Sequence, residues 1–251
     1  MAHQLSTASD LIVGAWKNSL RHWPTYLEFF FFFLAFGAIQ WSVAIATRNT
    51  TTTGSWLAVL LGGSALNAVL IAFISVALIS NVWHGLDDGA PHVFDSFRRA
   101  KSRLLPFIGV SIMVFLASLG GLLLLVVGLF VFFFLYRFAG YAVTIDGRGV
   151  WASLGESRRL FDNRFWGVAW RLAATYLYFF MLTNLLTLLQ LAAAGGLQGD
   201  FGLYFGSINT WSSLSSYHLL ILTMAPTIAT ALTMPLLTAS DLRLWRELKK
   251  A

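Results

Sequence analysis

The strongest candidate metal ligands in the sequence lie close together between two long apolar runs. They are His84, Asp87, Asp88 and His92. If this segment were helical, separations of three, four and eight residues would place all four side chains on one face. Glycines and a proline are interspersed with them, and these residue types favour a turn. We interpret the segment as a solvated loop, and we expect neither a metal nor any other cofactor.

A second group of polar residues lies inside apolar runs and could line a polar cavity. Its members are Asn67, Thr183, Asn184, Thr187, Thr223, Thr227 and Thr230. Such side chains can line a transport route, or they can form hydrogen bonds between helices worth about 0.6 kcal/mol each. We favour packing. Arg137 and Arg171 are expected to reach the cytoplasmic surface by extending their long side chains.

Enzymatic chemistry has little support in these residues. The chain has no cysteine, which excludes thiolate metal sites and cysteine nucleophiles. No activated nucleophile with a neighbouring base is recognisable, and Gly147-Arg148-Gly149 is too short to cradle a phosphate, so it predicts a turn. We expect a protein that is not an enzyme.

The composition places the chain in a membrane. Hydrophobic residues make up 57% of it and charged residues 11%, whereas soluble proteins carry about 25% charged residues. This excludes a soluble enzyme and a disordered chain. The net charge of +6 is divided into short blocks between apolar runs, which is typical of a polytopic membrane protein and gives no support to nucleic-acid binding.

Six segments are long enough to cross the bilayer, since a helix needs about 20 apolar residues to do so. The predicted fold is therefore an all-α, polytopic membrane bundle forming a single transmembrane domain. The predicted spans are 27–47, 56–82, 104–124, 127–146, 165–194 and 217–240. With this numbering, all but one of the 17 lysines and arginines, Arg48, fall on the side of both termini. The positive-inside rule therefore predicts that both termini are cytoplasmic.

Three amphipathic helices are expected on the cytoplasmic side, over 9–23, 91–104 and 149–162, each preceding a pair of spans. Their apolar faces would carry Ile12, Trp16, Ser19 and Trp23 in the first, Val93, Phe97, Ala100 and Leu104 in the second, and Val150, Leu154, Ser157 and Phe161 in the third. The recurrence suggests three repeated units. Basic residues expected to contact anionic lipid headgroups are Lys17, Arg21, Arg98, Arg99, Lys101, Arg103, Arg158 and Arg159.

Several short motifs resemble a known family. They are Gly89-Ala90-Pro91 with Phe94-Asp95-Ser96-Phe97, a glycine-rich hairpin between the third and fourth spans, Leu154-x-x-Ser157-x-x-Leu160, and Leu244-Trp245-x-x-Leu248. These features are similar to the six-span membrane-domain family named after glycerophosphoryl diester phosphodiesterase. The chain departs from that pattern at Val127-Gly128 and Ser153. In fused members the phosphodiesterase is a separate soluble domain after the spans, so the resemblance implies a membrane domain without catalytic machinery.

Two functional hypotheses follow. The first is a non-enzymatic accessory, scaffold or assembly protein in a larger membrane complex, using the cytoplasmic helices and the outer segment 195–216 to contact a membrane protein partner or a second copy. The alternative is a carrier for a lipid or another amphipathic small molecule, moving along the polar faces of the last two spans. A membrane-embedded enzyme comes third.

Overall fold

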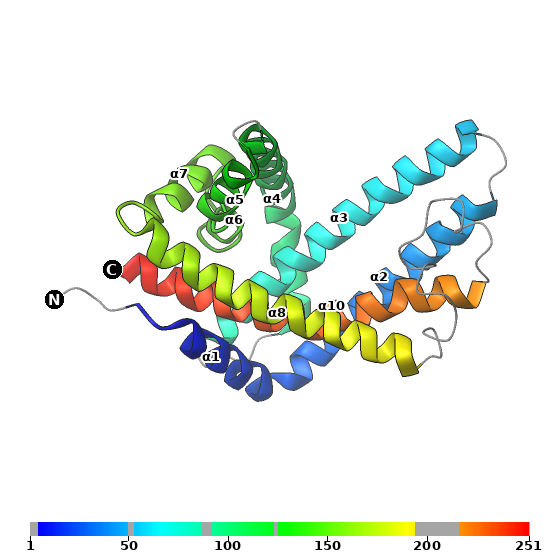
Figure 1. The fold of residues 1–251 in the computed structure, drawn as a ribbon, viewed down its shortest axis with the longest axis horizontal. Coiled ribbons are helices and arrows are strands. Elements are labelled where there is room, and N and C mark those ends of the chain that lie inside the picture. The colour runs from blue at the N-terminus through cyan, green and yellow to red at the C-terminus, as the bar shows by residue number, and fades with distance from the viewer. Residues whose placement is uncertain (1–4, 50–52, 87–91, 123–124, 194–215, 251) are drawn as a thin grey trace. The chain divides into compact units, whose positions relative to one another are not determined.

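A computed structural model of the chain describes residues 5–49, 53–86, 92–122, 125–193 and 216–250 (Figure 1). Within these ranges the secondary structure is helical, without a strand. The helices are α1 (Ala8–Arg21), α2 (Trp23–Asn49), α3 (Thr53–Gly85), α4 (Val93–Leu122), α5 (Leu125–Leu135), α6 (Ala139–Asp146), α7 (Val150–Leu160), α8 (Phe165–Ala193) and α10 (Ser216–Lys250). Asp87, Asp88, Pro91 and most of the predicted outer segment lie outside the described residues.

The predicted all-α, polytopic fold is confirmed. In the described part of the chain, six helical stretches are long and apolar enough to cross a membrane. They are Trp23–Thr47, Leu61–Gly85, Val93–Gly121, Gly128–Asp146, Phe165–Ala193 and Leu219–Lys250. Many apolar side chains on these stretches are exposed, Phe31, Phe115 and Phe180 among them. In a bilayer such side chains face lipid, so the chain is a multi-pass membrane protein.

The described residues group into two compact units, and α2, α3, α8 and α10 contribute residues to both. One unit comprises 27–71 and 180–234. Within it, a Cβ atom added to Gly37 of α2 would lie 2.9 Å from Thr227 Cγ2 of α10, so these helices approach closely at a residue without a side chain. Gly63 of α3 meets Val43 of α2 in the same way. Small residues at helix contacts are a common means of packing in membranes.

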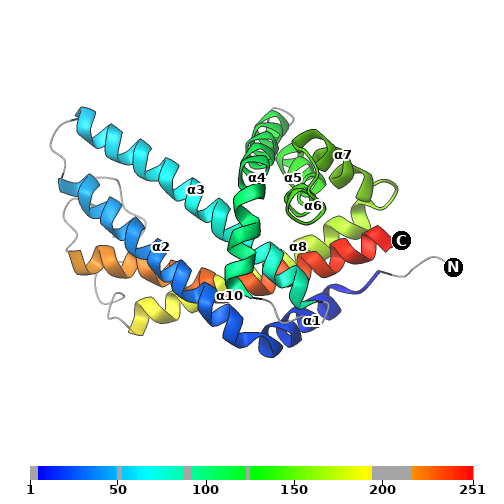
Figure 2. The ribbon, with the colours of Figure 1, turned by 180° about the vertical axis from the view of Figure 1, so that it is seen from behind.

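The other unit comprises 1–26, 72–179 and 235–251. Within it, α5, α6 and α7 lie beside α4 in both views of the ribbon (Figures 1 and 2). A buried apolar cluster holds three of these helices together through Val110 of α4, Ala139 and Val143 of α6, and Leu154 of α7. This unit positions the candidate site described below.

The close approach of α4 and α5 depends on glycine. A Cβ atom added to Gly121 would lie 2.6 Å from the carbonyl oxygen of Gly128. No side chain fits at that separation, so the backbones of the two helices approach each other more closely than any other residue type would allow. The glycine-rich hairpin noted in the sequence therefore has a steric reason at Gly121, whereas a Cβ atom at Gly120 would meet nothing.

The segment 91–104 differs from its prediction as a separate interfacial helix. It continues without a break into the following span as the single helix α4, although Pro106 lies inside that helix. Proline removes one backbone donor, but the turns on both sides are anchored by buried residues, Ala100 before it and Val110 after it. Packing on both sides of the proline keeps the helix continuous where the change in hydropathy suggested a boundary.

The predicted apolar faces also differ in what covers them. On α7, Leu154, Ser157 and Phe161 are buried, and at the start of α4 Val93 and Ala100 are buried. The buried residues of these two faces pack against the protein itself, whereas Val150, Phe97 and Leu104 of the same faces are partly exposed. On α1 the buried residues are instead Leu11, Gly14, Ala15 and Asn18, which leaves Trp16 and Trp23 of the predicted face exposed.

Candidate functional site: a buried ion pair at a helix break

Arg137 lies in a turn that divides one of the membrane-crossing stretches. The stretch Gly128–Asp146 is built from α5 and α6, with residues 136–138 between them and Arg137 at its midpoint. In this turn the Arg137 N–H donates to the carbonyl of Phe134 and the Ala139 N–H donates to that of Tyr136, each at 3.1 Å. These hydrogen bonds join residues three positions apart, whereas those of an α-helix join residues four positions apart. The α-helix is therefore interrupted at the charged residue.

Ser157 of α7 stabilises the interrupted backbone. Its hydroxyl donates to the carbonyl oxygen of Leu135 at 2.6 Å and accepts from the N–H of Phe138 at 3.2 Å. The Ser157 side chain is fully buried. Buried backbone groups without partners are costly, and one hydroxyl satisfies a group on each side of the break. The small residue in the predicted amphipathic pattern therefore has a specific structural role.

The charge of Arg137 is paired with Asp241 of α10. Arg137 Nε and Nη2 donate to Asp241 Oδ2 at 3.0 and 2.7 Å. The Asp241 side chain is inaccessible to solvent, and that of Arg137 is 26% exposed. The geometry is that of a salt bridge with two hydrogen bonds, both made to a single carboxylate oxygen.

Two tyrosines complete the cluster on the same oxygen. The hydroxyls of Tyr141 in α6 and Tyr176 in α8 donate to Asp241 Oδ2 at 2.9 and 3.2 Å. The Arg137 guanidinium carbon lies 4.9 Å from the Tyr176 ring centroid and 5.7 Å from that of Tyr141, within cation–π range. The rings therefore stabilise the cation while their hydroxyls stabilise the anion.

One carboxylate oxygen has no such partner. Asp241 Oδ1 is buried and accepts no hydrogen bond from the described residues. Arg137 also lines an adjacent cavity of about 350 Å³, whose wall is otherwise mainly apolar and includes Phe107, Val114 and Phe133. The cluster thus combines the Arg137–Asp241 ion pair, a carboxylate oxygen without a partner among the described residues, and a neighbouring cavity with a mainly apolar wall.

Sequence reasoning missed this cluster. Arg137 is expected to reach the cytoplasmic surface, but its side chain pairs with Asp241, which directly follows the last predicted span. Arg137 was the only charge in an apolar run of more than forty residues, and an ionisable residue in a span is by default a functional candidate. Its partner lies 104 positions away, so no local pattern joins the two.

The predicted polar residues of the last spans form hydrogen bonds largely within the helices. Thr187, Thr223 and Thr227 donate to carbonyls four residues earlier, at 2.7 to 2.9 Å, and Asn184 donates to Phe180. The hydroxyls of Thr183 and Thr233 lie 2.7 Å apart and link α8 to α10. Asn67 Oδ1 is buried without a partner among the described residues. A polar cavity along these residues stays a prediction.

The predicted basic residues lie on three helices of the unit that holds the ion pair. Lys17 and Arg21 are on α1, Arg98, Arg99, Lys101 and Arg103 on α4, and Arg158 and Arg159 on α7. Most are exposed, and Arg159 pairs with Glu156 at 3.2 Å. Their contact with anionic headgroups stays a prediction.

One of the two histidines of the candidate metal group, His84, has protein partners. His84 Nδ1 lies 2.6 Å from the carbonyl oxygen of Ser80, and Arg99 contacts the same ring. No group of three metal-ligating side chains occurs among the residues that the structure describes. The predicted turn at Gly147-Arg148-Gly149 is confirmed, because Gly147 follows the end of α6 in the left-handed conformation and Gly149 directly precedes α7.

Fold and site together define an α-helical, multi-pass membrane protein with a buried ion pair at an interrupted span. No protein-family model, curated protein or solved structure matches the chain. Its resemblance to the membrane-domain family named after glycerophosphoryl diester phosphodiesterase stays a prediction.

Proposed function

We propose that this protein is a non-enzymatic accessory or scaffold protein of a bacterial inner membrane, with both termini in the cytoplasm. The observation that carries the proposal is the Arg137–Asp241 cluster. Its ionic and phenolic groups are bonded to one another and join α6, α8 and α10 with the turn before α6. Buried groups bonded to one another in this way favour one specific arrangement of the helices, which is the property a scaffold needs.

Exposed aromatic residues support a contact role for the same unit. Phe94, Trp151, Trp166 and Trp170 are more than 70% exposed, and α1 leaves Trp16 and Trp23 accessible. Tryptophan is favoured at the membrane–water boundary and is enriched in protein interfaces. The positive charges on α1, α4 and α7 fit the anionic lipids of the cytoplasmic leaflet, which agrees with the proposed orientation.

Site-specific photo-crosslinking in native membranes tests this proposal. A photoreactive amino acid at position 151 should give a discrete protein adduct, whose mass identifies either a second copy of the 27.8 kDa chain or another membrane protein. The matched control position is Leu116 on α4, an exposed apolar residue within a span, where we expect adducts with lipid. Lipid adducts alone at both positions, together with purification of the chain by itself, would contradict a scaffold.

The apolar cavity beside Arg137 favours the second candidate, a carrier for a lipid or another amphipathic molecule. A cavity of about 350 Å³ with a cation at one edge could accept an anionic headgroup or an acidic apolar compound. Transbilayer movement of fluorescent phospholipids in proteoliposomes tests it. A scaffold leaves the rate at that of empty liposomes. A carrier raises it and loses the increase when Asn184 and Thr227 are replaced by leucine in a protein that remains folded.

A further inference from the structure

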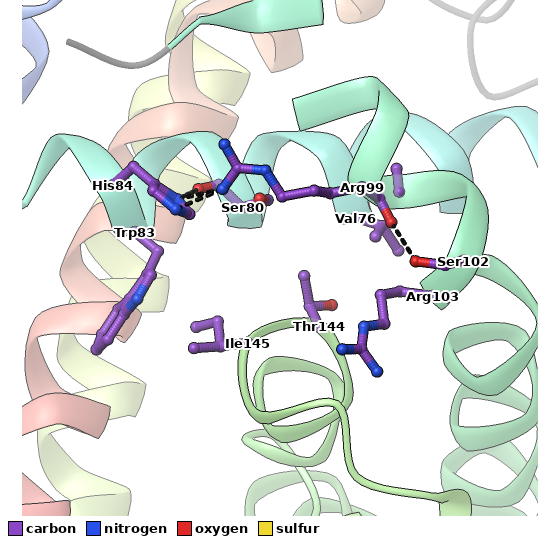
Figure 3. Close-up of a pocket in the computed structure, with 10 residues that line it drawn as sticks. Val76, Ser80, Trp83, His84, Arg99, Ser102, Arg103, Thr144 and Ile145 are labelled. Carbon is purple, nitrogen blue, oxygen red and sulfur yellow. Dashed lines mark hydrogen bonds between the residues drawn. The ribbon is translucent and has the colours of Figure 1, made fainter. Parts of the chain in front are cut away.

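A second cavity, of about 340 Å³, lies in the unit that contains the ion pair, between α3, α4 and α6 (Figure 3). Its polar lining comes from Ser80 and His84 of α3, Arg99 and Arg103 of α4, and Thr144 of α6, with Trp83 on one side. Figure 3 shows the guanidinium groups of Arg99 and Arg103 at the rim of the open space, one above it and one beside Thr144. The function proposed above does not use this cavity.

Among the described residues, Arg103 has no counter-charge within ion-pair distance. No described residue accepts a hydrogen bond from its guanidinium, which lies against the backbone at Gly147. Gly147 has a φ of +67°, and a Cβ atom there would overlap the guanidinium. A left-handed glycine at the end of α6 is therefore what allows Arg103 to occupy this position beside the cavity.

Arg99 and His84 form the opposite rim. The Arg99 guanidinium contacts the imidazole of His84, whose Nδ1 lies 2.6 Å from the carbonyl oxygen of Ser80. This pattern assigns the ring proton to Nδ1 and leaves Nε2 as the acceptor for Arg99. A guanidinium has five N–H donors, so Arg99 keeps four that this contact does not use. Among the described residues that line the cavity, none carries a carboxylate.

Thr144 supplies a neutral donor inside the cavity. Its side chain is 92% buried, given its relative exposure of 8%, and its hydroxyl has no hydrogen-bond partner among the described residues. A buried hydroxyl without a partner costs free energy unless a ligand or a water molecule satisfies it. The nearby carboxylate of Asp146 is already paired with Lys249 at 2.5 Å and with Arg148 at 3.5 Å.

We propose that this cavity binds a phosphate group. Two guanidinium groups provide planar pairs of N–H donors for phosphate oxygens, and the Thr144 hydroxyl is a third donor group. The volume is near the lower end for small-molecule sites, so it suits a phosphate with a small substituent and leaves no room for acyl chains. Inorganic phosphate and the headgroup of an anionic phospholipid share this chemistry.

Calorimetric titration of the 251-residue chain in a neutral detergent tests the proposal. The probes are inorganic phosphate and water-soluble dihexanoyl phosphatidic acid. Arg103→Gln and Arg99→Gln should each weaken binding of a probe about tenfold, as expected for the loss of one charge-assisted hydrogen bond. Thr144→Val should weaken it less. Lys101→Gln, the same change of charge at an exposed residue of the same helix that does not line the cavity, is the matched control and should leave affinity within about twofold.

The two probes separate the sources. Similar affinity for both indicates free phosphate, whereas binding of phosphatidic acid alone, with the same dependence on Arg103, indicates a lipid headgroup. Equal losses in Arg103→Gln and Lys101→Gln would overturn the proposal, because they would show general surface attraction, and so would failure to bind either probe. Circular dichroism and gel filtration establish that each variant is folded, and Arg103→Lys, which keeps the charge but loses the planar pair of donors, should bind with intermediate affinity.

Discussion

Arg137 and Asp241, which are 104 positions apart in the sequence, form a salt bridge in which Arg137 Nη2 lies 2.7 Å from Asp241 Oδ2. The Asp241 side chain is inaccessible to solvent. The pair joins an interrupted helix to the chain's last described helix, and two tyrosine hydroxyls share the same carboxylate oxygen. Desolvation of two charges makes such a pair weak evidence for stability in itself. Removal of one partner, however, leaves the other charge buried and unpaired.

Replacement of Asp241 by asparagine should lower the free energy of unfolding by about 3 kcal/mol, because Arg137 would stay charged without its counter-ion. We choose the lower end of the usual range because the Arg137 side chain is partly exposed. Unfolding in mixed micelles with increasing sodium dodecyl sulfate measures the change. The double variant Arg137→Met with Asp241→Leu should recover at least half of the loss, since it removes both charges together. An Asp241→Asn protein as stable as the wild type would show that the pair is not formed.

Replacement of Ser157 by alanine should cost about 2 kcal/mol, because the carbonyl of Leu135 and the N–H of Phe138 would both lose a buried partner. Ser111→Ala is the control. Ser111 is exposed and donates to the carbonyl of Phe107 within its own helix, so this change should have an effect within about 0.5 kcal/mol. The same unfolding measurement applies to both variants. Equal effects would mean that the hydroxyl of Ser157 does not support the helix break.

Replacement of Gly121 by alanine should destabilise the hairpin between α4 and α5 by about 1–3 kcal/mol, because the new methyl group would overlap the backbone of Gly128. Gly120→Ala adds the same methyl group to the neighbouring position, where it meets nothing, and should be neutral or stabilising by up to about 1 kcal/mol. The midpoints of thermal unfolding in detergent give the comparison. A reversed order of the two variants would contradict the close approach of the helices.

The stability of the first turn of α1 should fall at acidic pH, because the Asp10 carboxylate that caps the helix becomes protonated. Hydrogen bonds from the side chain and backbone of Thr7 hold the pKa of Asp10 below its ordinary value of 3.8. The charged carboxylate is the form that caps the helix, so its contribution is complete above pH 3.8 and is lost as pH falls through the lowered pKa. Hydrogen exchange of the α1 amides, corrected for intrinsic rates, should differ between the wild type and Asp10→Asn at neutral pH, and the difference should shrink as the pH falls below 3.8. A difference that is unchanged by pH would exclude this cap.

The sequence by itself determined the class of protein, an all-α chain with six helical stretches long and apolar enough to cross a membrane. Runs of apolar residues, the scarcity of charge and the clustering of basic residues are local properties, and hydrocarbon thickness converts their length into crossing helices. The turn at Gly147 was equally predictable, because glycine is the residue that readily adopts its left-handed backbone.

Tertiary structure alone decided the partners of the polar groups. The local sequence around Arg137 is compatible with two positions of its side chain, extension to the membrane surface or pairing with an acid. The proximity of α10 selects pairing with Asp241. The same holds for Ser157, whose hydroxyl matters because a helix break lies beside it, and for Arg103 and Thr144, which share a cavity through helix packing. Desolvation makes these groups seek partners, but which partners they reach depends on distances between helices that local sequence does not encode.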